Sequence, residues 1–203
     1  MIEPLITISI LAGGQSRRMG CPKSFVNLAG KPLIQHLFER VKTLKYPIHV
    51  IANDPEAFKQ FGYPVFPDVL TDKGALGGIY TSLTHSETLY TLCLACDMPF
   101  VNTDLIAHLV TYTSQYDAVV PMVNNYPQGL HTIYHRRCHT VIEHQIMQDN
   151  LQLSQVFALF HTNFIPETTL RRIDPALHAF INLNTPQELQ AAEILYRDLH
   201  GST

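Results

Sequence analysis

The 203-residue sequence predicts an α/β fold, a doubly wound and mostly parallel sheet with helices on both faces. Three observations support this prediction. Short apolar or β-branched runs alternate with segments of helical periodicity, which is the pattern of parallel strands joined by helices. A glycine-rich segment follows the first apolar run, as in sheets that bind ligands beyond the carboxyl ends of their strands. No linker, repeat or low-complexity tract interrupts residues 1–203, so we expect a single domain.

The first half of the chain is predicted to alternate strands and helices, each bounded by Gly, Pro or polar residues. In chain order these segments are a strand at Leu5–Leu11, a helix opened by Lys31-Pro32, a strand at Ile48–Ala52, a short helix from Pro55, a strand at Val65-Phe66, a glycine-rich loop at Asp72–Gly78, a helix at Ile79–Thr84 and a strand at Tyr90–Ala95.

The second half continues the pattern more weakly until its last helix. Thr103 is expected to cap a helix that runs to about Tyr112, followed by strands at Asp117–Pro121 and Leu130–Tyr134 and a helical region over Arg136–Leu159. Near the C-terminus, Thr185 is predicted to cap a final helix. Pro186 stands in its first turn and Glu188 completes a capping box.

Composition excludes several classes of protein. The chain is 46% hydrophobic and 15% charged, which is too apolar for a disordered protein. Its 14 Lys and Arg against 17 Asp and Glu give a net charge of −3, so no positive field attracts nucleic acid or an anionic membrane. The apolar runs fall short of the roughly 18 residues that cross a bilayer, and no positive N-terminal segment resembles a secretory signal. We expect a cytoplasmic protein with reduced cysteines and small-molecule partners.

The glycine-rich segment from Leu11 to Lys23 carries the strongest functional signal. Backbone N–H groups at Gly13 and Gly14 can approach phosphate oxygens closely. Three cations in seven residues, Arg17, Arg18 and Lys23, supply the charge that an oligophosphate needs. The segment matches neither the P-loop nor the dinucleotide motif G-x-G-x-x-G. An oligophosphate is therefore the expected ligand, and solvated arginines on a glycine-rich turn are the alternative.

Carboxylates after the strands predict a metal and a nucleotide contact. Asp97 ends a strongly apolar strand before Met98-Pro99, so its carboxylate should emerge at the ligand-binding edge and bind Mg²⁺, unless it only caps a turn. Asp68 and Asp72 both precede the second glycine-rich segment, and residue type alone does not choose between them.

These motifs together resemble the small nucleotidyltransferases, and most closely the molybdenum cofactor guanylyltransferases. The resemblance spans nearly the whole chain, with Ala75 as a departure because proline is commoner there. It is carried by Leu-Ala-Gly-Gly at 11–14, Ser-Arg-Arg-Met-Gly at 16–20, Lys23, Gly30-Lys31-Pro32-Leu33, Gly74–Gly78, Asp97-Met98-Pro99-Phe100 and Asn182-Leu183-Asn184-Thr185-Pro186.

The resemblance implies a Rossmann-like nucleotidyltransferase that moves GMP from GTP to the terminal phosphate of molybdopterin with Mg²⁺ and releases pyrophosphate. Further partners would be molybdoenzyme apoproteins or other proteins of cofactor biosynthesis. It also implies roles for individual residues. The catalytic residues would be Lys23, Arg17, Arg18 and Asp97, with Asp97 as metal ligand; the nucleotide contacts Leu11, Ala12, Gly13, Gly14, Lys23, Asn53, Asp68, Gly78 and Asp97; and the acceptor contacts Asn182, Asn184 and His131.

Two other functions remain open at this stage. The same site could serve a cytidylyl- or sugar-phosphate nucleotidyltransferase, and a non-catalytic protein could bind and deliver the nucleotide or the cofactor. Asn182 and Asn184 could also be ordinary turn residues. Cys93 and Cys96 are not expected to share a metal, because residues three apart on a strand point to opposite faces.

Overall fold

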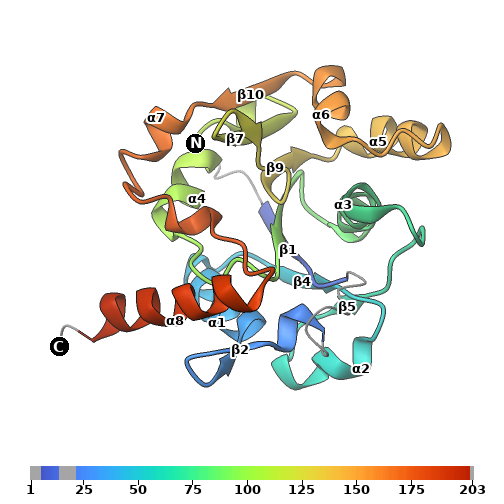
Figure 1. Ribbon diagram of the computed structural model, residues 1–203. Helices are drawn as coiled ribbons and strands as arrows, with labels where there is room; N and C mark the ends of the chain where they lie inside the picture. The colour runs from blue at the N-terminus through green and yellow to red at the C-terminus, as the bar shows by residue number, and fades with distance from the viewer. Residues whose placement is uncertain (1–5, 14–21, 202–203) are drawn as a thin grey trace.

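An eight-stranded sheet forms the centre of the computed structural model, which describes residues 6–13 and 22–201 (Figure 1). Seven strands follow the order β10-β7-β9-β6-β1-β4-β5, and β8 pairs with β7. A separate two-stranded sheet joins β2 to β3. The strands are β1 (Ile6–Leu11), β2 (Asn27–Leu28), β3 (Lys31–Pro32), β4 (Ile48–Ile51), β5 (Val65–Phe66), β6 (Tyr90–Ala95), β7 (Ala118–Val123), β8 (Tyr126–Pro127), β9 (His131–His135) and β10 (Thr162–Ile165).

The sheet is mostly parallel, as predicted, and the departure has a local cause. β1 is parallel to both β4 and β6, and β10 is parallel to β7. β9 runs antiparallel to β6 and β7, and β8 antiparallel to β7. Asn124 and Asn125 both adopt positive φ between β7 and β8. Two consecutive left-handed residues make a tight hairpin, and a hairpin forces antiparallel pairing.

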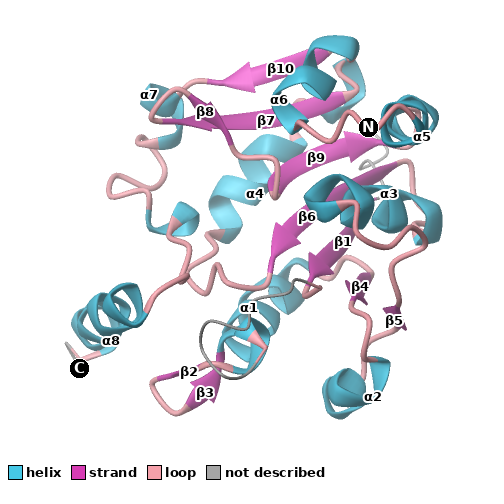
Figure 2. Ribbon diagram, turned by 45° about the vertical axis from the view of Figure 1, so that its right-hand side comes forward, coloured by secondary structure: helices cyan, strands magenta, loops and turns pink. Residues whose placement is uncertain are grey.

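Helices cover both faces of the sheet, which confirms the predicted architecture (Figure 2). Ile8, Ile10 and Leu92 point into the core shared with α1 and α4, whereas Leu11 and Cys93 belong to the core on the side of α3 and α5. The α-helices are α1 (Leu33–Val41), α2 (Pro55–Phe58), α3 (Gly74–His85), α4 (Thr103–Val110), α5 (Cys138–Met147), α6 (Leu153–Val156), α7 (Glu167–Leu170) and α8 (Pro186–His200).

Cys93 in β6 and Cys96 just beyond its end lie in different cores. Cys93 packs on the α3 side and Cys96 on the α1 side, so they cannot share one ion, as predicted from strand geometry. Both thiols are buried and free, and burial raises the pKa of each to about 12. These thiols are therefore protonated packing groups at neutral pH.

Several predicted boundaries are wrong. Thr103 does not cap α4, because Asn102 accepts the backbone N–H groups of the first turn. Pro32 is the N-cap of α1 and not its first helical residue. The helical region predicted at Arg136–Leu159 is split after α5, where Asp149 adopts a positive φ.

The segment Asp72–Gly78, predicted as a glycine-rich loop, is largely the start of a helix. α3 already begins at Gly74, and a Cβ at Gly78 would lie 2.6 Å from Leu11 Cδ2 on β1. Glycine at 78 therefore serves the close approach of helix and strand, which composition alone does not distinguish from loop flexibility.

The predicted capping box of α8 is confirmed. Thr185 Oγ1 accepts the backbone N–H of Glu188, and the Glu188 carboxylate accepts the N–H of Thr185. The short β2–β3 sheet and α8 enclose a third core that includes Leu28, Leu33 and Ala192. Across the described part of the chain, the helices are all too short or too polar to cross a membrane.

Buried His131 is expected to make the protein sensitive to mild acid. Its side chain is fully buried, and neither ring nitrogen makes a hydrogen bond to any residue that the structure describes. Burial lowers the pKa of His131 to about 4. In the unfolded chain the imidazole of His131 takes up a proton near pH 6.5, whereas in the folded protein it does so only near pH 4. The contribution of neutral, buried His131 to the free energy of unfolding is therefore complete above pH 6.5 and is lost as the pH falls towards 4. Between these two pH values, His131 changes the free energy of unfolding by up to about 1.4 kcal/mol per pH unit. Urea unfolding between pH 7.5 and 4.5 measures how the free energy of unfolding depends on pH. This dependence should be shallower for His131→Phe than for the wild type, and equal dependences would contradict the role of His131.

Candidate functional site

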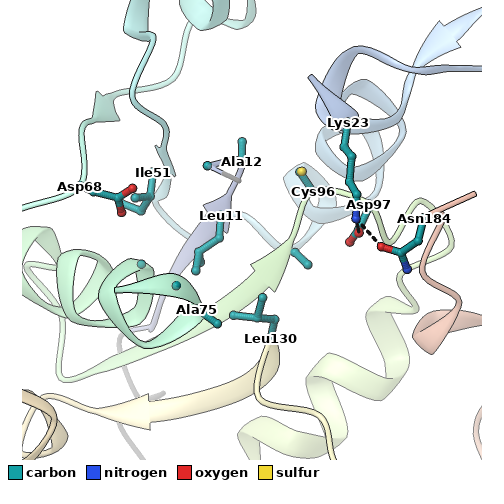
Figure 3. A pocket seen from close by; sticks show the side chains of 14 residues that line it. Leu11, Ala12, Lys23, Ile51, Asp68, Ala75, Cys96, Asp97, Leu130 and Asn184 are labelled. Atoms are coloured by element: carbon teal, nitrogen blue, oxygen red, sulfur yellow. Dashed lines mark hydrogen bonds and ion pairs between the residues drawn. The ribbon is translucent and has the colours of Figure 1, made fainter. Parts of the chain in front are cut away.

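A cavity of about 470 Å³ opens at the carboxyl ends of β1, β4 and β6. Its walls come from the ends of these strands, from the first turns of α3, and from three polar side chains that approach from separate segments (Figure 3). Those three are Asp68, Lys23 and Asn184. A second hollow of about 880 Å³ shares Gly13, Asp68 and Gly74 with the first and extends over Asn53. Together they can accommodate an extended ligand.

Asp97 is the buried carboxylate of the site. β6 is buried along its whole length and ends at Ala95, which places Asp97 in the wall of the cavity with 8% of its surface exposed. Lys23 Nζ lies 3.1 Å from Asp97 Oδ2. On the backbone side, Leu183 N–H donates to Asp97 O at 3.1 Å. Asp97 is thus held at both its side chain and its main chain.

The Asp97 carboxylate has one free oxygen that suits a metal ion. Oδ1 is buried and accepts no hydrogen bond from residues 6–13 or 22–201, which is costly unless a cation or donor arrives there. Within residues 6–13 and 22–201 there is no group of three or more His, Cys, Asp or Glu that could hold a metal. A hard divalent cation that needs one protein carboxylate, with water and phosphate oxygens as its other ligands, fits this donor set.

Lys23 links the carboxylate to the C-terminal segment. It begins the 3-10 helix η2 (Lys23–Phe25), and its ammonium donates to both Asp97 Oδ2 and Asn184 Oδ1 (Figure 3). About a quarter of the Lys23 side chain remains exposed. This places a positive charge at the cavity surface, next to the free oxygen of Asp97.

Asp68 and Asn53 form a reciprocal pair on the opposite wall. Asn53 Nδ2 donates to Asp68 Oδ2 at 2.9 Å, and Asp68 N–H donates to Asn53 Oδ1 at 2.9 Å. A Cβ added to Gly13 would lie 3.3 Å from Asp68 Oδ2, so glycine leaves the strand end close to this carboxylate. Asp72 lines only the second hollow, on a turn with φ of 60°. Of these two candidate carboxylates, Asp68 lines both hollows and Asp72 lines the second alone.

The structure brings together most of the predicted site residues. The lining of the two hollows includes Leu11, Ala12, Gly13, Lys23, Asn53, Asp68, Gly78, Asp97 and Asn184. Gly14, Arg17 and Arg18 lie outside the described residues. Asn182 is half-buried and lines neither hollow. His131 is also absent from both linings, because its ring is buried beneath Phe180 with the ring centroids 4.8 Å apart.

Sequence reasoning missed the apolar walls of the cavity. Ile51, Cys96 and Leu130 line it, together with Ala75 at the start of α3. Ile51 and Cys96 lie at or just beyond the carboxyl ends of buried strands, the place where ligands of such sheets bind. Position at a strand end could have found them, whereas residue type could not.

Comparison with known proteins decides the family. Residues 8–162 match the MobA-like NTP transferase domain. A probable molybdenum cofactor guanylyltransferase of Natranaerobius thermophilus is 31% identical over 92% of this chain and 94% of its own length. A molybdenum cofactor guanylyltransferase of Desulfosudis oleivorans is 33% identical, with 93% and 94% covered. The chain belongs to the molybdenum cofactor guanylyltransferases.

Solved structures agree with this assignment. The molybdopterin-guanine dinucleotide biosynthesis protein A of Archaeoglobus fulgidus superposes with a TM-score of 0.82 at 27% identity, covering 95% of this chain and 99% of that one. The 2-C-methyl-D-erythritol 4-phosphate cytidylyltransferase of Thermus thermophilus shares the fold, with a TM-score of 0.70 at 17% identity over 94% of this chain and 98% of that one. As a member of this family, the chain is a nucleotidyltransferase of Rossmann-like fold.

The contact between Gly78 and Leu11 makes a testable prediction. Gly78→Ala would place its Cβ 2.6 Å from Leu11 Cδ2, so we expect a loss of about 1–3 kcal/mol of stability from overpacking. Better helix propensity offsets at most about 1 kcal/mol. Because Leu11 also lines the cavity, nucleotide affinity should fall as well.

A double-mutant cycle supplies the control. Leu11→Ala removes the atoms that Gly78→Ala would strike, so the double variant should lose less stability than the sum of the single losses. Denaturant unfolding of the four proteins measures this coupling. Additive losses would show that the strand and helix relax without a clash.

Proposed function

We propose that this chain transfers GMP from GTP to the terminal phosphate of molybdopterin, forming molybdopterin guanine dinucleotide and pyrophosphate. The observation that carries the proposal is the meeting of Lys23, Asp97 and Asn184 beside a cavity whose far wall holds Asp68. One side of the cavity has the charges for phosphates. The other has a carboxylate and strand-end backbone for a base.

On the base side, we assign Leu11–Gly13, Asn53 and Asp68 to the guanine nucleoside. Guanine presents two N–H donors, at N1 and N2, which a carboxylate can accept as a pair. Asn53 holds Asp68 through two hydrogen bonds and so fixes the orientation of the carboxylate. Cytosine lacks donors in that arrangement, which favours GTP over CTP.

On the phosphate side, we assign the α-phosphate region to Lys23 and Asp97. An oxygen of the acceptor phosphate attacks the α-phosphorus of GTP in line, forming one P–O bond as the bond to pyrophosphate breaks. The ammonium of Lys23 stabilises the charge that grows on the transferring group, and the loop backbone orients it. Arg17 and Arg18 are proposed to add positive charge. This direct transfer needs no covalent enzyme intermediate.

Mg²⁺ is the proposed metal: Asp97 would hold it, and it would supply charge neutralisation at the phosphates. Asp97 can serve this role because Lys23 already occupies Oδ2 and leaves the other oxygen available.

On the acceptor side, we assign molybdopterin to the segment that contains Asn182 and Asn184. Asn184 is exposed, faces Lys23 and lines the cavity. His131, predicted from the resemblance, is left out of this assignment because its fully buried ring has no surface to offer an acceptor. The buried free thiols favour a cytoplasmic location. Molybdoenzyme apoproteins or other proteins of cofactor biosynthesis would receive the product.

The proposal is tested by product mass and pyrophosphate release with purified protein, Mg²⁺ and molybdopterin. GTP, CTP, ATP and UTP are supplied in turn. Selective formation of the guanine dinucleotide supports the proposal. A preference for CTP would overturn the base assignment, and GTP binding without any product would indicate a delivery protein.

Asp97→Asn is expected to abolish most turnover while leaving GTP binding largely intact. The amide loses the negative charge that binds the metal, so kcat should fall by at least about 100-fold. Asp72→Asn is the matched control, since Asp72 lies on a turn in the second hollow and takes no part in the proposed transfer. Single-turnover rates and GTP titrations measure both effects. Equal activity in the two variants would remove Asp97 from the mechanism.

Asp68→Asn is expected to weaken selection of guanine. Replacing a carboxylate acceptor by an amide removes a charged hydrogen bond, so KM for GTP should rise by about 10- to 100-fold. KM for CTP should change little, because cytosine makes no matching contact. Competition between GTP and CTP for product measures the ratio, with Asp72→Asn again as control. An unchanged ratio would place the base elsewhere.

A further inference from the structure

The carboxylate of Glu188 makes one contact more than its helix cap requires. Oε2 accepts the backbone N–H of Thr185 at 2.8 Å, which is the capping-box contact, and also the N–H of Asn184 at 2.6 Å. The Asn184 N–H, and then the other local hydrogen bonds and the charge of Lys23, lower the pKa of Glu188 against the opposing effect of desolvation. Glu188 is therefore ionised at neutral pH and bonded to a residue that lies outside the helix.

Asn184 leads from that contact directly to the site. Its side-chain oxygen accepts from Lys23, and Lys23 in turn binds Asp97 Oδ2. A continuous chain of hydrogen bonds thus runs from the first turn of α8 to the carboxylate at the end of β6. Each link joins polar groups at hydrogen-bonding distance, so the orientation of one affects the next.

The contacts of α8 and of the segment around Asn184 hold Glu188 in a fixed position. The neighbouring Leu183 is buried against Ala192 of α8 in the third core and donates its N–H to Asp97 O. Farther along α8, Glu193 accepts the N–H of Ala29 from the turn between β2 and β3 at 2.8 Å. α8 is therefore anchored, and its first turn can hold the backbone of Asn184 in one orientation.

We propose that Glu188 is a positioning residue for the transfer reaction: it fixes the backbone of Asn184 so that the Asn184 amide meets Lys23 at the acceptor side of the cavity. Glu188 touches no substrate. The effect on catalysis rests on the proposed function, whereas the contact to Asn184 can be tested without it.

Three variants separate this role from helix capping. Glu188→Ala removes both backbone contacts. Glu188→Gln keeps an oxygen that can accept them. Thr185→Ala removes the other half of the capping box, the bond from Glu188 N–H to Thr185 Oγ1, and leaves the Asn184 contact in place. Loss of either half weakens the start of the helix, so Glu188→Ala and Thr185→Ala should lower the melting temperature to a similar extent.

The first readout is hydrogen exchange at the backbone N–H of Asn184, measured below the melting temperature of every variant. We expect protection in the wild type, Glu188→Gln and Thr185→Ala, and loss of protection in Glu188→Ala. Rapid exchange in the wild type, or equal protection in all four proteins, would overturn the proposed contact.

The second readout is steady-state kinetics with GTP and molybdopterin. In Glu188→Ala, KM for molybdopterin should rise by about fivefold to tenfold with a smaller change in kcat, as for a group that orients a ligand-binding residue. Glu188→Gln should recover most of the loss, and Thr185→Ala should resemble the wild type. Equal kinetics for Glu188→Ala and Thr185→Ala would reduce Glu188 to a helix cap. If wild-type protein makes no dinucleotide, the proposed function fails, and the exchange experiment still decides the contact.

Discussion

The ammonium of Lys23 holds together three segments on which the rest of the site depends. Lys23 ends the glycine-rich segment that starts at Leu11, Asp97 lies just beyond the end of β6, and Asn184 precedes α8. A buried carboxylate with neither oxygen paired is strongly unfavourable, so the ion pair permits Asp97 to stay buried in the wall of a partly apolar cavity. The same contact leaves Oδ1 without a donor from the described residues. One interaction thus serves both the stability of the site and its capacity for a cation.

Close packing sets the opposite wall of the cavity. Gly78 lets α3 approach Leu11 of β1, and Gly13 leaves space beside Asp68. A side chain at either glycine would have to displace atoms of the strand end or the carboxylate. The distance between the wall that carries Asp68 and the wall that carries Lys23 therefore depends on backbone contacts as well as on the polar residues themselves.

The sequence predicted the features that local rules determine. An apolar strand followed by Asp97 and a proline, and a Thr185–Glu188 capping box, each have one favourable local structure, and both predictions are confirmed. Predictions failed where a neighbour in space decides the outcome. The sequence predicts a loop up to Gly78, but the requirement for glycine there comes from Leu11, some 67 positions earlier in the chain. His131 was assigned to the acceptor side, yet its pairing opposite Leu94 places its ring beneath Phe180. The link from Glu188 to Asn184 is also invisible in a capping-box pattern, which specifies only the contact to Thr185.

The division of the chain parallels the division of the proposed reaction. The part that matches the MobA-like NTP transferase domain ends at residue 162 and contains Lys23, Asp68 and Asp97. In the proposed reaction, these residues face the groups that any nucleotidyl transfer shares, namely a base, a triphosphate and a metal. Asn184 and Glu188 lie beyond residue 162, on the segment that α8 anchors. Because nucleotidyltransferases differ in their acceptors, a separately anchored segment could adapt to the acceptor without disturbing the strand ends that are proposed to hold the nucleotide. The two parts meet where Lys23 donates to Asn184, so in the proposed reaction the position of Asn184 would couple acceptor binding to the phosphate side of the site.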